Sequence, residues 1–94
     1  MAARIDVQAL ADGAFRVRVT EGASQSSHHV TVKPEDYARL ANGKAEPAEL
    51  VRRSFEFLLE REPKESILAR FDLAVIARYF PEFAREIQRR LAAR

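Results

Sequence analysis

The spacing of apolar residues changes its period at Pro34, and this change constrains the fold more than any other feature of the chain. Before Pro34, apolar residues alternate with polar ones, as in strands that bury one face. After Pro34 they recur every three or four residues, as in helices that bury one side. The sequence therefore predicts an α+β domain in which an antiparallel sheet comes first and helices follow.

Three segments of the first third alternate and predict strands, at about residues 4–10, 14–20 and 28–33. The register of the first pair follows from the need to keep apolar side chains on one face. A three-residue loop at 11–13, with Gly13 at positive φ, meets this need because it sets Val7 opposite Val17. A two-residue loop would mix the two faces.

The same rule predicts the second strand pair, with Val19 opposite Val30. The segment 21–27, EGASQSS, then becomes a polar, mobile connection. This register also sets Arg16 opposite Lys33 on the outer face. The expected sheet is a three-stranded antiparallel meander with one polar face.

Four or five helices are expected to pack on one face of the meander, and the segment at about 47–61 is expected to be the central one. Charged residues fill an arc of only about 100° of this helix, and apolar side chains take most of the rest. One neighbour cannot cover so wide an apolar surface. We therefore expect the sheet on one side of this helix and later helices on its other side.

The last third of the chain is expected to hold short helical elements, in order at 66–71, 73–79 and from 81 onward. Asp72 is a good N-cap for the second of them. The chain shows no internal repeat and no low-complexity linker. We therefore predict that residues 1–94 form a single domain.

Four short motifs follow one another in the C-terminal half: SFEFLLEREP from Ser54, SIL from Ser66, FDL from Phe71 and YFPEF from Tyr79. Together they resemble the pattern of a group of short, uncharacterised bacterial proteins, over about residues 28–88. The resemblance implies a small bacterial cytosolic protein. It implies no activity and no site residue.

The composition excludes several kinds of chemistry. The chain has no Cys, which excludes disulfides, cysteine nucleophiles and cysteine zinc sites. Its three isolated glycines form no phosphate-binding loop, so we expect no cofactor. No apolar run approaches the roughly 18 residues of a membrane helix, and the first residues lack the apolar core of a signal peptide. We therefore expect a cytoplasmic protein with no membrane association.

His28 and His29 are the only histidines and the first candidates for catalysis or metal binding. Neighbours on a strand point to opposite faces, which is poor geometry for joint chelation. The nearby Ser24, Ser26 and Ser27 lie in a predicted loop, without the rigid elbow and oxyanion donors that a nucleophile needs. The sequence therefore predicts no catalytic, cofactor-binding or metal-binding residue.

A basic patch on the outer sheet face is the remaining candidate site. Arg16 is expected opposite Lys33, with Arg18 and His29 close by. Like charges held opposite each other cost stability, so such a patch can indicate an anionic partner. These four residues are therefore the candidate contacts to an anion or a nucleic acid. Asp6 weighs against this interpretation, as does the lack of an outward aromatic platform.

The favoured interpretation of function is a small non-enzymatic cytosolic interaction or regulatory protein that associates with itself or with a protein partner. An open sheet exposes its edges, and strands 4–10 and 28–33 could pair with such a partner. Tyr79 and Phe80 are another place where an aromatic can remain exposed. The alternative is a nucleic-acid-binding regulator, which a net charge of only +2 does not favour. A third interpretation is an enzyme subunit whose site forms with a partner.

Overall fold

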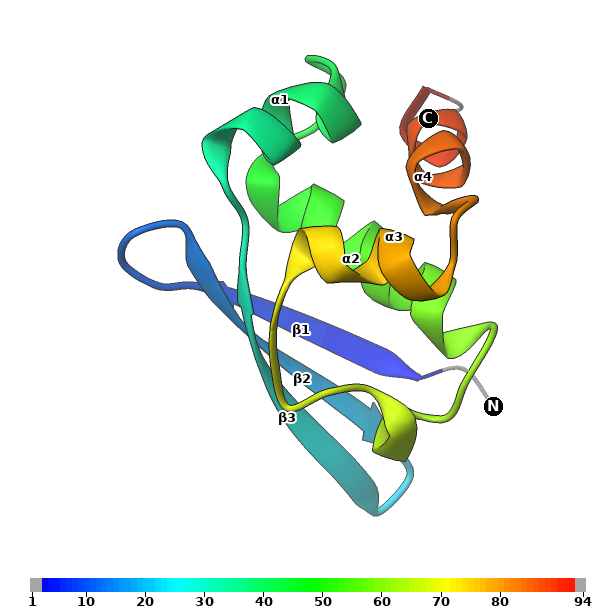
Figure 1. Ribbon diagram of the computed structural model, residues 1–94. Helices are drawn as coiled ribbons and strands as arrows, with labels where there is room; N and C mark the ends of the chain where they lie inside the picture. The colour runs from blue at the N-terminus through cyan, green and yellow to red at the C-terminus, as the bar shows by residue number, and fades with distance from the viewer. Residues whose placement is uncertain (1–2, 93–94) are drawn as a thin grey trace.

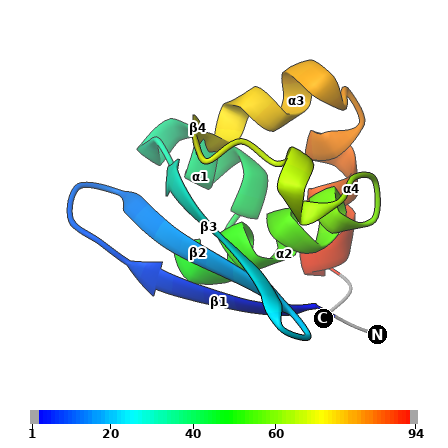
Figure 2. The ribbon, with the colours of Figure 1, turned by 90° about the horizontal axis from the view of Figure 1, so that it is seen from below.

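The computed structural model describes residues 3–92 and has the α+β architecture that the sequence predicts (Figure 1). Its four-stranded sheet consists of β1 (Arg4–Ala9), β2 (Ala14–Glu21), β3 (Ser24–Thr31) and β4 (Arg70–Asp72), in that order. The described residues form four α-helices: α1 (Pro34–Ala41), α2 (Pro47–Leu59), α3 (Ile76–Tyr79) and α4 (Phe83–Ala92). Of two short 3-10 helices, η1 (Lys64–Ser66) precedes β4 in the sequence and η2 (Leu73–Val75) follows it. The helices lie on one side of the sheet (Figures 1 and 2).

The first hairpin confirms the predicted register. Val7 lies opposite Val17, and the main-chain N–H of Leu10 donates to the carbonyl oxygen of Ala14 at 2.8 Å, which closes a three-residue loop. Gly13 takes the predicted positive φ, at +72°. Its neighbour Asp12 also lies in the left-handed region, with φ at 62°, which the sequence did not indicate.

The second hairpin contradicts the predicted register. Val30 lies opposite Phe15, where the prediction set it opposite Val19. The chain reverses directly after β2, because Gly22 adopts a φ of +60° and allows a tight turn. The polar segment 24–27 therefore belongs to β3, and the predicted loop at 21–27 is wrong. The two registers keep the same residues on each face, so Val30 is still buried.

The strand β4 replaces a predicted helical turn at 66–71. It runs parallel to β3, with Val30 opposite Phe71, and makes the sheet mixed where a three-stranded meander was expected. The N–H of His29 donates to the carbonyl oxygen of Ala69 at 2.8 Å. β4 thus supplies hydrogen-bond partners to main-chain groups at the edge of β3. Part of the edge predicted at 28–33 is therefore not free to pair with a partner chain. Asp72 caps the following turn η2 as predicted, since its carboxylate accepts from the N–H of Ala74.

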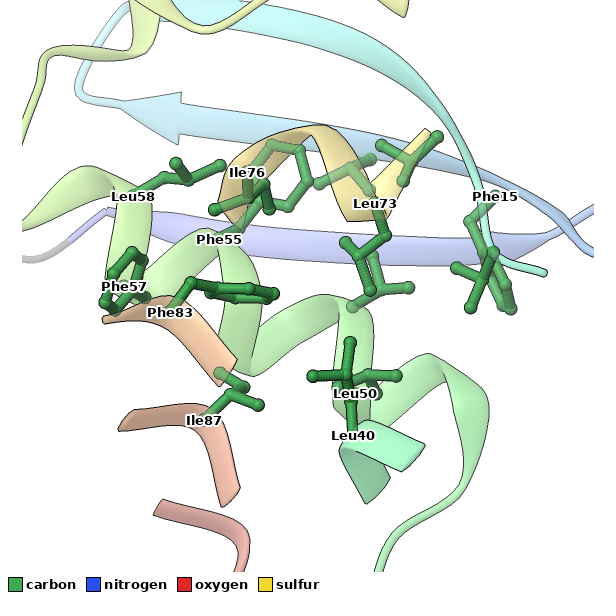
Figure 3. Close-up of a cluster of buried hydrophobic side chains, with 14 of the residues drawn as sticks. Phe15, Leu40, Leu50, Phe55, Phe57, Leu58, Leu73, Ile76, Phe83 and Ile87 are labelled. Carbon is green, nitrogen blue, oxygen red and sulfur yellow. The ribbon is translucent and has the colours of Figure 1, made fainter. Parts of the chain in front are cut away.

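The helix α2 is central, as predicted, although it ends at Leu59 and not at 61. It contacts β1 on one side and α4 on the other. Figure 3 shows Phe57 of α2 beside Phe83 of α4, and Leu50 near Leu40 of α1. Burial on several sides explains the narrow charged strip of this helix. Within residues 3–92, no helix is both long and apolar enough to cross a membrane.

An ion-pair network fastens α4 to the end of α2. Arg90 of α4 bonds to Glu60 at 2.6 Å and to Glu86 at 2.8 Å. Arg61 bonds to Glu82 at 3.2 Å, and its guanidinium lies 3.7 Å from the ring centroid of Phe57. The guanidinium of Arg61 therefore covers one face of the buried Phe57 ring.

This network predicts a loss of stability in acid. Hydrogen bonds from Arg89 and Arg90 lower the pKa of Glu86 from 4.5 to about 2. A lowered folded-state pKa gives stability that is present above pH 4.5 and is lost as the pH falls toward 2. We expect the melting temperature of the protein to fall over this range, and to fall less in Glu86→Gln. Melting curves recorded from pH 6 to pH 2 test this, with Glu35→Gln as the control variant. An equal fall of the melting temperature with pH in the two variants would contradict it.

Candidate binding surfaces: a basic sheet face and an apolar groove

Three of the four residues predicted to contact an anion share the outer face of the sheet. Arg16 lies directly opposite His29, and Arg18 lies opposite Ser27. Lys33 does not belong to this group, because it follows β3 and occupies the N-cap position of α1. The predicted pairing of Arg16 with Lys33 is therefore wrong, and its cause is the shifted register of the second hairpin.

Arg70 is a member of this face that the sequence reasoning missed. β4 sets it opposite His29, on the other side from Arg16. The alternation of β4 buries Phe71 on the inner face and turns its two neighbours outward. The polar–apolar–polar order of Arg70, Phe71 and Asp72 is the only local signal, and three residues are too few to identify a strand.

Three arginines of this outer face lack carboxylate partners. Within residues 3–92 none of Arg16, Arg18 and Arg70 forms an ion pair, and Arg16 donates a hydrogen bond to the side-chain oxygen of Gln8 at 3.5 Å. The Nδ1 atom of His29 is buried and has no hydrogen-bond partner among the described residues. Fewer of the arginines on this face than on the helical surface therefore have an acidic partner.

His28 points to the opposite face from His29, as predicted, and is buried. Its Nδ1 lies 2.8 Å from the carbonyl oxygen of Leu68, and its Nε2 lies 2.8 Å from the hydroxyl oxygen of Ser26. A carbonyl only accepts, so Nδ1 carries a proton and donates to the oxygen of Leu68. Neither Ser26 nor His28 lines the apolar groove or the hollow beside β1 that are described below. The pair fastens the segment before β4 to β3, and the ring of His28 packs 5.3 Å from that of Phe55.

The second candidate surface is an apolar groove of about 230 Å³ on the helical side of the molecule. Leu68 and Tyr79 are the exposed large hydrophobic residues of the described chain, at 48% and 67% exposure, and both line it. Exposure of Tyr79 confirms a prediction, whereas Phe80 is partly buried. The other lining residues are Leu58, Glu62, Ser66, Ile67, Phe71, Val75, Ile76 and Phe80. Apolar side chains gathered in one exposed hollow are typical of binding sites.

The edge of the sheet at β1 is partly masked. Arg52 of α2 donates to the main-chain oxygen of Ile5, beside a shallow hollow between β1 and α2. The edge predicted at 4–10 is therefore less open to a partner strand than the sequence suggested.

The described residues hold no group of three His, Asp or Glu side chains placed to bind a metal ion. The two surfaces that remain differ in chemistry, one being cationic and the other apolar. Comparison of the chain with protein-family models, with curated proteins and with solved structures gives no match.

Proposed function

We propose that this chain is a small, cytoplasmic, non-enzymatic interaction protein that associates with a second copy of itself through the apolar groove. The observation that carries the proposal is that Leu68 and Tyr79, both strongly exposed, line one hollow. Burying such side chains gains roughly 25 cal/mol for each Å² of apolar surface removed from water.

A second copy suits this groove because the same surface offers both a hollow and a projecting ring. The two copies of a twofold dimer present the same patch to each other, so each can place its Tyr79 over the other's Leu68. Charge supports the same arrangement. Glu62 lines the groove and Arg78 precedes Tyr79, and neither forms an ion pair within residues 3–92. Each can therefore pair with the opposite charge of the second copy.

The test is the mass in solution. The proposal predicts twice the chain mass of 10.7 kDa for the native protein at micromolar concentration, and the single mass for Leu68→Asp and for Tyr79→Asp. Light scattering coupled to gel filtration measures both. Ala38→Asp on α1 adds the same charge to an exposed position outside the groove and should leave the dimer intact.

A charge reversal tests the geometry of the dimer. Glu62→Arg should weaken the dimer, because the new positive charge would lie opposite Arg78 of the second copy. The double variant Glu62→Arg/Arg78→Glu should restore the dimer, because it brings opposite charges together again. A native protein that stays monomeric at high concentration would refute self-association. A double variant as weak as the single one would refute the twofold arrangement.

A further inference from the structure

We propose that the outer face of the sheet binds the phosphate backbone of a double-stranded nucleic acid through Arg16, Arg18 and Arg70. This surface is separate from the apolar groove, and the proposal does not depend on self-association. It starts from the register, which sets Arg16, His29 and Arg70 in one row across three strands. Neighbouring strands lie about 4.8 Å apart, so the two arginines of this row start about 10 Å from each other.

Arg18 extends the row into a patch. It lies two residues from Arg16 on the same strand and face, a step of about 7 Å. Three guanidinium groups and a histidine thus start within a small area of one face of the sheet. No helix of residues 3–92 covers this face, since these helices lie on the other side of the sheet (Figure 2).

The carboxylates of this face are already engaged. Asp6 bonds to Arg4 at 3.2 Å. Asp72 accepts from the hydroxyl of Thr31 and from the N–H of Ala74, each at 3.0 Å. Asp6 also lies opposite Arg18, but the outward strand residues carry four positive charges, of Arg4, Arg16, Arg18 and Arg70, against the two negative charges of Asp6 and Asp72, so this face keeps a net charge of +2 (4 − 2). Arg16 and Arg18 of β2 lie on one side of β3 and Arg70 of β4 lies on the other, so an anion bound across β3 would interact favourably with both sides.

The helical surface shows the opposite arrangement, because most of its arginines have acidic partners. Such partners occur for Arg39, Arg53, Arg61, Arg89 and Arg90. The contrast between the two sides of one small protein indicates that the sheet face receives its counter-charge from a ligand.

The kind of anion follows from what else the face presents. The strand residues that point outward are polar or charged apart from the small Ala14, and include no Phe, Tyr, Trp or large aliphatic side chain. A specific protein interface has an apolar centre, and unpaired bases are bound by stacking on aromatic rings. A duplex backbone needs neither, because guanidinium groups can grip its phosphates two hydrogen bonds at a time. The face therefore fits a duplex bound without regard to sequence.

The test is fluorescence anisotropy with a labelled 20-base-pair DNA duplex and its RNA counterpart, titrated from 50 to 200 mM salt. Three phosphate contacts predict a slope of log affinity against log salt of about −2.7, which is about a 40-fold loss of affinity over this range. The variant Arg16→Gln/Arg70→Gln should reduce the slope to about −0.9. Circular dichroism of each variant checks that it stays folded.

The matched control is Lys44→Gln/Arg85→Gln, which removes the same charge from exposed helical-side positions without an ion pair in residues 3–92. This control should keep the native slope. Absence of binding to either duplex at 50 mM salt would overturn the proposal, as would an equal loss of affinity in the two double variants. Competition by polyglutamate that is as strong as competition by unlabelled duplex at the same charge concentration would also overturn it. Tighter binding of a single strand than of a duplex would also overturn the assignment to a double helix.

Discussion

Replacing Phe55 by alanine is expected to lower the free energy of unfolding by about 3–5 kcal/mol. The Phe55 side chain is fully buried, with its ring 5.3 Å from that of His28 and 6.0 Å from that of Phe71. It therefore joins the central helix α2 to β3 and to β4. Its removal leaves a cavity that these fixed elements cannot collapse to fill.

Urea unfolding followed by circular dichroism measures this loss. A domain of this size has a total stability of roughly 5–15 kcal/mol, so Phe55→Leu serves as a milder variant if the alanine variant unfolds. Phe80→Ala is the matched control, because that ring is only partly buried at the groove. It should lose clearly less stability. Equal losses in the two alanine variants would contradict the central position of Phe55.

Replacing Gly13 by alanine is expected to lower the free energy of unfolding by about 2 kcal/mol or more. The positive φ of Gly13 costs about 1–2 kcal/mol for an L-residue. In addition, a Cβ atom there would lie 3.0 Å from the carbonyl oxygen of Val32. The loop cannot easily move away, because the carbonyl oxygen of Gly13 accepts a hydrogen bond from the N–H of Val32 at 2.9 Å.

Gly22→Ala separates the two contributions. Gly22 has a similar φ, of +60°, but a Cβ atom would meet nothing within 4 Å. Its loss should stay near the conformational cost alone, about 1–2 kcal/mol. Thermal or urea unfolding of both variants gives the difference. A loss at Gly22 as large as that at Gly13 would show that the contact with Val32 carries no weight.

The parts of the fold that the sequence predicts are those in which apolar spacing is strong. Val7 and Val17 favour the three-residue loop of the first hairpin over a two-residue loop, since the three-residue loop sets both on the inner face. The wide apolar surface of α2 likewise predicts its central place. The second hairpin could not be predicted in this way, because the segment 24–27 holds no apolar residue to define a face. Its turn depends on Gly22, whose positive φ leaves no periodic signal.

The residues of the candidate sites could likewise be predicted only where apolar and polar residues alternate clearly. Alternation alone puts Arg16, Arg18 and His29 on one polar face, and the structure brings them together there. Arg70 joins them through a parallel pairing between residues about 40 positions apart, which local periodicity does not encode. The exposure of Leu68 could not be predicted either, because its motif has the apolar character of a buried turn.

The short strand β4 also has a consequence for the order of folding. The meander is built from contacts that are local in sequence, whereas β4 can pair with β3 only after the intervening helices have come together. Until then the outer edge of β3 is open to other chains. Ser24, Gln25, Ser26 and Ser27 make half of this edge hydrophilic, and hydrophilic edges resist aggregation. Since β4 covers only His29–Thr31, the polar sequence that concealed the strand from prediction protects this edge both before and after the sheet is complete.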